Sequence, residues 1–131
     1  MNGLNGYCKD FNQQIKDAGF WDSMGESLEM MGNDYNKEML TEHAKLNIKS
    51  THDAYITQKI MLIVSELSEA VEAMRKDNYG IMKKDTFEDE IADALLRTFD
   101  LCGQFDIDIE AQLEWKRNYN KTREKLHGKG F

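Results

Sequence analysis

The stretch "LIVSELSEAVEAMRKDNYGIMKKDTFEDEIADALLRTFDL", residues 62–101, decides the fold. Apolar residues recur in it at intervals of three and four rather than two, which is the pattern of amphipathic helices and not of strands. A turn signal at residues 77–80, Asp-Asn-Tyr-Gly, divides the stretch into two such segments. The stretch therefore predicts a helical hairpin.

The same period extends over most of the chain, which contains no proline. Helices are expected over about residues 7–18, 34–49, 52–76, 86–104 and 108–125. Gly19 is placed to end the first of them, and Asp108 is a good N-cap for the last. The sequence predicts an all-α fold, a bundle of four to five helices with no sheet.

Length and composition exclude several classes of protein. The chain has 131 residues, enough for one domain with a core, and 40% hydrophobic with 31% charged residues is an ordinary globular composition. No apolar run approaches the roughly 20 residues of a membrane span, and no signal-peptide core is present. Only Cys8 and Cys102 are present, so a disulfide framework is not expected. A cytoplasmic protein is predicted, and a net charge of −7 argues against nucleic-acid binding.

Four carboxylates stand inside the hairpin, in the patterns Glu66-x-x-Glu69 and Glu90-x-x-Asp93. At 100° per residue, each pair lies beside the apolar side of its helix, whereas Glu72 lies on the opposite side. The apolar arc next to the first pair is formed by Ile60, Val64, Leu67, Val71 and Met74. The back of the second helix is also mostly apolar, through Ala92, Leu96 and Phe99, so that helix is predicted to be covered on two sides.

Carboxylates that converge between packed helices repel one another and lose hydration. A proton, a basic side chain or a divalent metal ion can offset this, and an all-oxygen site suits Mg²⁺ or Mn²⁺. The alternative is a solvated acidic face with salt bridges to Lys59, Arg75 or Arg97. Two such pairs on adjacent helices favour the metal site.

Two further groups of residues suggest ligand binding. Lys116, Asn120 and Arg123 share one face of the last helix and form a reasonable row for gripping phosphates, although basic residues there also favour the helix dipole. Phe20 and Trp21 follow the first helix. Such an aromatic pair either packs in the core or stacks on a nucleobase.

With these residues in view, the chain resembles the MazG-like branch of the all-α nucleoside triphosphate pyrophosphatase superfamily. The family signature is E-x-x-E followed, after a spacer, by E-x-x-D, and this chain carries it at residues 66–69 and 90–93. The flanking "KIMLIVSELSEAVEAMRK" and "EDEIADALLRTFDL", the closing "NYNKTREKLHGKGF" and the "GFWD" at 19–22 are also similar to family sequence. The likeness defines one domain over 1–131 with its core at about 52–125, and residues 23–51 are interpreted as an insertion.

The resemblance implies a hydrolase that cleaves a nucleoside triphosphate between the α- and β-phosphates, releasing a monophosphate and pyrophosphate. It implies that Glu66, Glu69, Glu90 and Asp93 hold Mg²⁺, with Mn²⁺ as a possible substitute, and that Glu66 or Glu69 takes a proton from water. The phosphates are then expected at Lys116, Asn120 and Arg123, with Lys59 and Arg97 as second candidates, and the base at Phe20 and Trp21. The family also implies a homodimer or a dimer of dimers, for which the strip of Ala92, Leu96 and Phe99 is the expected contact.

Two other functions compete with this one. A redox-active di-metal carboxylate bundle requires an E-x-x-H motif on each of two helices, and the chain has one, from Glu124 to His127. A non-enzymatic acidic helical interaction protein would use the apolar back of the second helix to bind a partner, but it leaves the paired carboxylates unexplained.

Overall fold

A computed structural model describes residues 3–25 and 42–123 of the chain. Its helices are α1 (Leu4–Asp17), α3 (Glu42–Arg75), α4 (Phe87–Gln104) and α5 (Ile109–Lys121), and residues 22–25 are also helical. The described residues contain no strand, so the predicted all-α fold is confirmed. None of their helices has the length and apolar character needed to cross a membrane.

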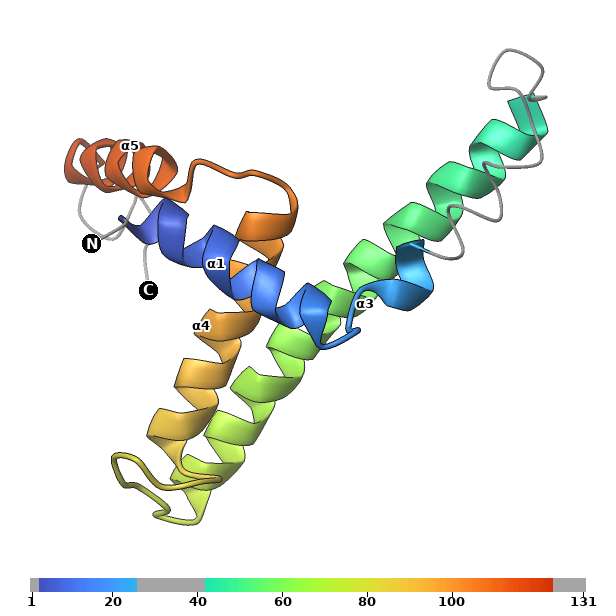
Figure 1. Cartoon of the computed structure of the whole chain (residues 1–131). Coiled ribbons are helices and arrows are strands. Elements are labelled where there is room, and N and C mark those ends of the chain that lie inside the picture. The colour runs from blue at the N-terminus through green and yellow to red at the C-terminus, as the bar shows by residue number, and fades with distance from the viewer. Residues whose placement is uncertain (1–2, 26–41, 124–131) are drawn as a thin grey trace.

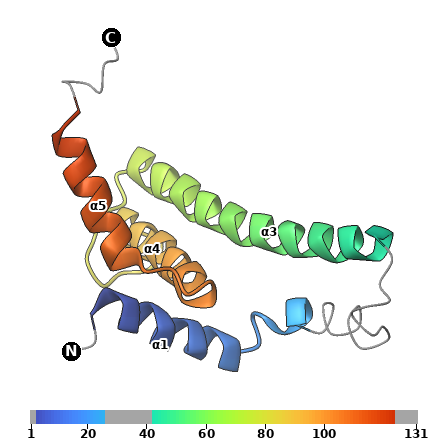
Figure 2. The ribbon, with the colours of Figure 1, turned by 90° about the horizontal axis from the view of Figure 1, so that it is seen from above.

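Helix α4 lies in the middle of the arrangement, with α3 on one side and α1 on the other (Figures 1 and 2). This confirms that the second helix of the hairpin is covered on two sides. Helix α5 lies near the start of α1, where Glu110 Oε1 accepts a hydrogen bond from the Leu4 amide at 2.6 Å. The side chains of Asn5 and Asp108 make a second contact there, at 2.7 Å.

Helix α3 is continuous over 34 residues, so the predicted break between residues 49 and 52 is wrong. An ion pair bridges the expected break, because Lys49 Nζ lies 2.5 Å from Asp53 Oδ2 one helical turn later. Such pairs stabilise a helix surface by roughly 0.2–0.5 kcal/mol, which helps to offset the weak helix preference of Ser50, Thr51 and His52. The rest of the expected helix at 34–41 lies outside the described residues.

The start of α4 is fixed by the loop that precedes it. Thr86 is fully buried, and its hydroxyl accepts the Asp89 amide at 3.4 Å as an N-cap while donating towards the Gly80 carbonyl at 2.9 Å. Asn78 Nδ2 donates to the Asp85 carbonyl at 2.6 Å across the same loop. The turn and the helix start are therefore as predicted. Asp108 caps α5 as expected, and that helix ends at Lys121 rather than near 125.

Helix α1 covers part of the strip that was expected to bind a partner, whereas Ala92 stays exposed. The ring of Phe99 meets Tyr7 edge-on, with centroids 5.7 Å apart, and Leu96 lines a cavity together with Phe11 and Ile15. The close approach depends on Gly103, where an added Cβ would lie 2.3 Å from the Cys8 carbonyl oxygen. Helix α1 therefore occupies part of the expected subunit contact, and the homodimer stays a prediction.

One exposed apolar surface lies on α3. The arc predicted to pack beside the carboxylates is between 44% and 51% exposed, at Ile60, Val64, Leu67, Val71 and Met74. The side of α3 that meets α4 is built from small and acidic residues instead, since Ala70, Ala73 and Glu66 are buried.

Candidate metal centre and adjoining pocket

Three of the four predicted metal ligands converge between α3 and α4. Glu66, Glu69 and Glu90 each place a carboxylate oxygen within 4.8 Å of the others. Glu66 and Glu90 are only 7% and 6% exposed, whereas Glu69 is open to solvent. The two helices can approach closely here because Ala70 on α3 and Ala94 on α4 occupy the contact and take little space.

This cluster is short of positive charge. Burial raises the pKa of Glu90 above its ordinary value, and a hydrogen bond with Glu66 and repulsion from Glu69 add to the shift. Arg97 supplies one cation, because its Nε and Nη2 both lie 2.6 Å from Glu66 Oε1. One guanidinium against three carboxylates leaves an excess of negative charge, and the donor set is all oxygen. These residues fit a hard divalent cation such as Mg²⁺.

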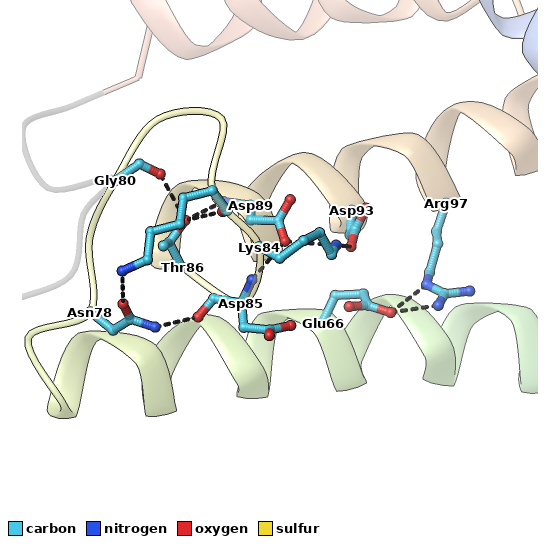
Figure 3. Close-up of polar contacts among 10 residues, drawn as sticks. Glu66, Asn78, Gly80, Lys84, Asp85, Thr86, Asp89, Asp93 and Arg97 are labelled. Carbon is cyan, nitrogen blue, oxygen red and sulfur yellow. Dashed lines mark hydrogen bonds and ion pairs between the residues drawn. The ribbon is translucent and has the colours of Figure 1, made fainter.

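The fourth predicted ligand, Asp93, points to a different neighbour (Figure 3). Its Oδ2 lies 3.7 Å from Lys84 Nζ, and the same ammonium lies 2.7 Å from Asp89 Oδ2. Asp85, Asp89 and Glu90 form a second group of carboxylates within 4.8 Å, so Glu90 belongs to both groups. Asp93 therefore borders the cluster without joining it in this structure.

A cavity of about 440 Å³ adjoins the cluster between α1, α3 and α4. It shares Asp93 and Arg97 with the border of the acidic group. Its wall is otherwise mostly apolar, and its lining consists of Phe11, Ile15, Phe20, Lys59, Leu62, Asp93, Leu96, Arg97 and Asp100. Apolar walls with a few charged groups are typical of small-molecule sites.

A buried network supports this cavity. Asp100 is 6% exposed and accepts hydrogen bonds from Asn12 Nδ2 at 2.6 Å and from Trp21 Nε1 at 3.1 and 3.2 Å. Lys59 Nζ lies 4.2 Å from the centre of the Trp21 ring and donates to the Phe20 carbonyl at 3.0 Å. Burial lowers the pKa of Lys59. These contacts fix the wall of the cavity and place an ammonium group on it.

The two aromatic candidates for base stacking have different surroundings. Trp21 is 5% exposed, its nitrogen is bound to Asp100, and Lys59 covers one face of its ring. Phe20 is 65% exposed and lines the cavity. Of the pair, Phe20 is the side chain that a planar ligand can reach in this arrangement, and Trp21 belongs to the supporting network.

The structure does not bring the basic row of α5 to the carboxylates. Lys116, Asn120 and Arg123 are exposed, and the ammonium of Lys116 lies 5.1 Å from the centre of the Tyr119 ring. Helix α5 lies near α1, at the opposite end of α4 from the loop that precedes Glu90 (Figure 1). Of the second candidates, Arg97 contacts Glu66 of the acidic cluster, and both Arg97 and Lys59 line the cavity.

Two residues of the site were not predicted. Asp100 follows Asp93 and Arg97 at helical spacings of seven and three, so the shared helix face could have revealed it. Lys84 lies in a loop, and no periodic signal places a loop side chain over a helix. Of the E-x-x-H motif, Glu124 and His127 lie outside the described residues.

No known protein family, curated protein or solved structure matched the chain.

Proposed function

We propose that this chain is a Mg²⁺-dependent nucleoside triphosphate pyrophosphohydrolase that cleaves its substrate between the α- and β-phosphates. The observation that carries the proposal is the convergence of Glu66, Glu69 and Glu90 within 4.8 Å beside a cavity that contains two cationic side chains. The reaction itself comes from the resemblance to the MazG-like proteins.

In this proposal Glu66, Glu69 and Glu90 hold the metal ion, and Asp93 completes the predicted set of ligands. Asp93 would have to exchange Lys84 for the metal, which is a small change because the ion pair is exposed and long, at 3.7 Å. Bound magnesium would neutralise triphosphate charge and polarise a nearby water molecule.

Glu69 is the better candidate for the general base. Oε1 of Glu66 already lies 2.6 Å from two nitrogens of Arg97, Nε and Nη2. Glu69 accepts a hydrogen bond from the hydroxyl of Ser65, at 3.3 Å. Glu69 therefore keeps more free lone pairs to accept a proton. The water oxygen attacks the α-phosphorus, its proton passes to Glu69, and the bond to the bridging oxygen breaks to release pyrophosphate.

The cavity would hold the rest of the substrate. Arg97 borders both the cluster and the cavity, and Lys59 lies on the cavity wall, so these cations are placed to contact phosphate oxygens. Phe20 offers an exposed ring to the base. Lys116, Asn120 and Arg123 stay predicted phosphate contacts, although the structure does not bring their helix to the cluster. A cytoplasmic location is part of the same proposal.

The test is pyrophosphate release from a panel of ribo- and deoxyribonucleoside triphosphates with Mg²⁺, with Mn²⁺ and with excess EDTA. We expect monophosphate and pyrophosphate in equal amounts with either metal and neither product in EDTA. If the products are instead a nucleoside diphosphate and inorganic phosphate, the bond that is cleaved lies between the β- and γ-phosphates. Full turnover in EDTA, or no turnover of any triphosphate, would reject the proposal.

A further inference from the structure

Lys84 holds its ammonium group between two carboxylates at the edge of the candidate metal centre (Figure 3). Its Nζ lies 2.7 Å from Asp89 Oδ2 and 3.7 Å from Asp93 Oδ2. Asp93 is the predicted metal ligand that stands outside the cluster of three glutamates. In this structure a lysine is therefore the cationic partner of the fourth predicted ligand.

The backbone next to Lys84 is held in place, whereas its side chain is open to solvent. The Asp85 amide donates a hydrogen bond to Asp89 Oδ2 at 2.9 Å, and the Asp85 carbonyl accepts one from Asn78 Nδ2 at 2.6 Å. The side chain of Lys84 is 75% exposed. Its ammonium group can therefore change partners by rotation of the side chain alone, while the loop keeps its path.

The other cations near the centre have partners elsewhere. Nε and Nη2 of Arg97 both lie 2.6 Å from Glu66 Oε1, and Lys59 Nζ donates to the Phe20 carbonyl at 3.0 Å. Neither contact involves Asp93. The basic row of α5 is not brought to the cluster. A cation that loses its partner when Asp93 turns to a metal ion has to be sought in the loop before α4.

We propose that Lys84 exchanges Asp93 for a phosphate oxygen of the substrate when Asp93 joins the metal ligands. The inference rests on the proposed function. Magnesium in proteins is commonly held by one or two carboxylates together with phosphate oxygens of the substrate, so the phosphates come close to the carboxylates that bind the ion. The ammonium of Lys84 already lies beside Asp93. Because an ammonium group has three donors, it can keep Asp89 while it donates to a phosphate.

This exchange predicts effects of opposite sign on the binding of two ligands. Without nucleotide, Lys84 competes with the metal ion for Asp93, so removing its charge should tighten Mg²⁺ binding. In the presence of metal, Lys84 donates to the phosphates, so the same change should weaken triphosphate binding. A lysine that only supports the loop would change both affinities in the same direction or leave both unchanged.

The test is calorimetric titration of Lys84→Met, first with Mg²⁺ alone and then with inorganic triphosphate at saturating Mg²⁺. Inorganic triphosphate carries no base, so the base preference of the protein does not enter. We expect Mg²⁺ to bind about two- to fivefold more tightly, as for the loss of an exposed ion pair, and triphosphate to bind about tenfold more weakly. Lys84→Arg keeps the charge and should restore both affinities towards those of the parent.

Lys83→Met is the matched control. Lys83 precedes Lys84 in the same loop and carries the same charge, but its Nζ contacts Asn78 Oδ1, at 3.2 Å, and not a carboxylate. Its substitution should leave both affinities close to those of the parent, and circular dichroism checks that every variant stays helical.

Two kinds of result would overturn the role of Lys84. If the parent binds both ligands and releases pyrophosphate, but Lys84→Met behaves like Lys83→Met or shifts both affinities in the same direction, this inference alone is wrong. If the parent binds neither Mg²⁺ nor triphosphate, the proposed function is rejected and the inference falls with it.

Discussion

The two sides of the α3–α4 hairpin have their polarities reversed relative to an ordinary bundle. The inner side buries Glu66 and Glu90 at 7% and 6% exposure, whereas the outer side leaves Leu67 and Val71 exposed at 46% and 51%. Burying carboxylates destabilises a fold, and exposing leucine and valine forgoes hydrophobic stabilisation. Stability of the single chain would favour the opposite arrangement. The proposed cation site would account for the inner side, because a bound cation offsets the cost of burying carboxylates.

The largest effect is expected at the inner side, from Glu69→Gln. This change keeps the shape of the side chain but removes a proposed metal ligand and the proposed base, so turnover of the triphosphate should fall by at least about 100-fold. Pyrophosphate release at saturating Mg²⁺ measures it.

Glu72→Gln is the matched control for this loss. Glu72 is an exposed glutamate on the same helix, three residues away, and its contacts are ion pairs with Arg75 and Lys76. Its substitution should leave turnover within about twofold, because exposed ion pairs contribute little. Equal losses in the two variants would show that Glu69 has no special role.

The next effect concerns the network under the cavity. Asp100→Ala leaves the donors of Asn12 and Trp21 buried without their acceptor, so the free energy of unfolding should fall by about 2–4 kcal/mol. Asp106→Ala, which removes an exposed ion pair with Lys9, should change it by less than about 1 kcal/mol. Urea unfolding of both variants measures the difference, and similar midpoints would contradict the structural role of Asp100.

Substitutions at the neighbouring residues Ala70 and Val71 compare the inner and outer sides of the α3–α4 hairpin directly. Ala70 is 2% exposed at the contact with α4, so Ala70→Leu should overpack it and lower the free energy of unfolding by about 1–3 kcal/mol. Val71→Leu, on the outer side, should change it by no more than about 0.5 kcal/mol. Thermal unfolding of both variants checks this, and a larger loss at residue 71 would mean that the sides are misassigned.

Helical periodicity predicted the hairpin, its turn and the buried positions of Glu66 and Glu90, because these depend on angles within one helix. Glu66 and Glu90 are buried as expected, and Thr86 and Asp108 begin α4 and α5. The continuity of α3 was not predicted, since Ser50 and Thr51 resemble a boundary and the Lys49–Asp53 pair bridges them.

Contacts between helices were harder to predict. A helical wheel shows that Leu67 and Phe99 are on apolar faces, but it does not show which face a neighbouring helix covers. Helix α1 covers Phe99 because Gly103 admits its backbone, and the face with Leu67 stays exposed. The ion pair between Lys84 and Asp93 depends on the path of a loop, which helical periodicity does not predict.

The smallest effect is expected from Glu90→Gln, and its size depends on pH. Burial raises the pKa of Glu90 in the folded protein, so folding is opposed at pH values above the ordinary pKa of glutamate, where the unfolded chain is ionised. In the absence of metal, Glu90→Gln should raise the melting temperature at pH 7. The gain should shrink as the pH falls below about 4, where the parent glutamate becomes protonated in both states. A gain that is independent of pH would contradict the raised pKa.

The most direct measurement of the central claim is the melting temperature during a Mg²⁺ titration at pH 7 and constant ionic strength. If Glu66, Glu69 and Glu90 hold the ion, Mg²⁺ should stabilise the parent protein, by about 2.7 kcal/mol at 100 times the dissociation constant. Glu72→Gln should respond like the parent, whereas Glu90→Gln should gain little. A parent protein that does not respond to Mg²⁺, or a Glu90→Gln variant that responds equally, would contradict a metal site between α3 and α4.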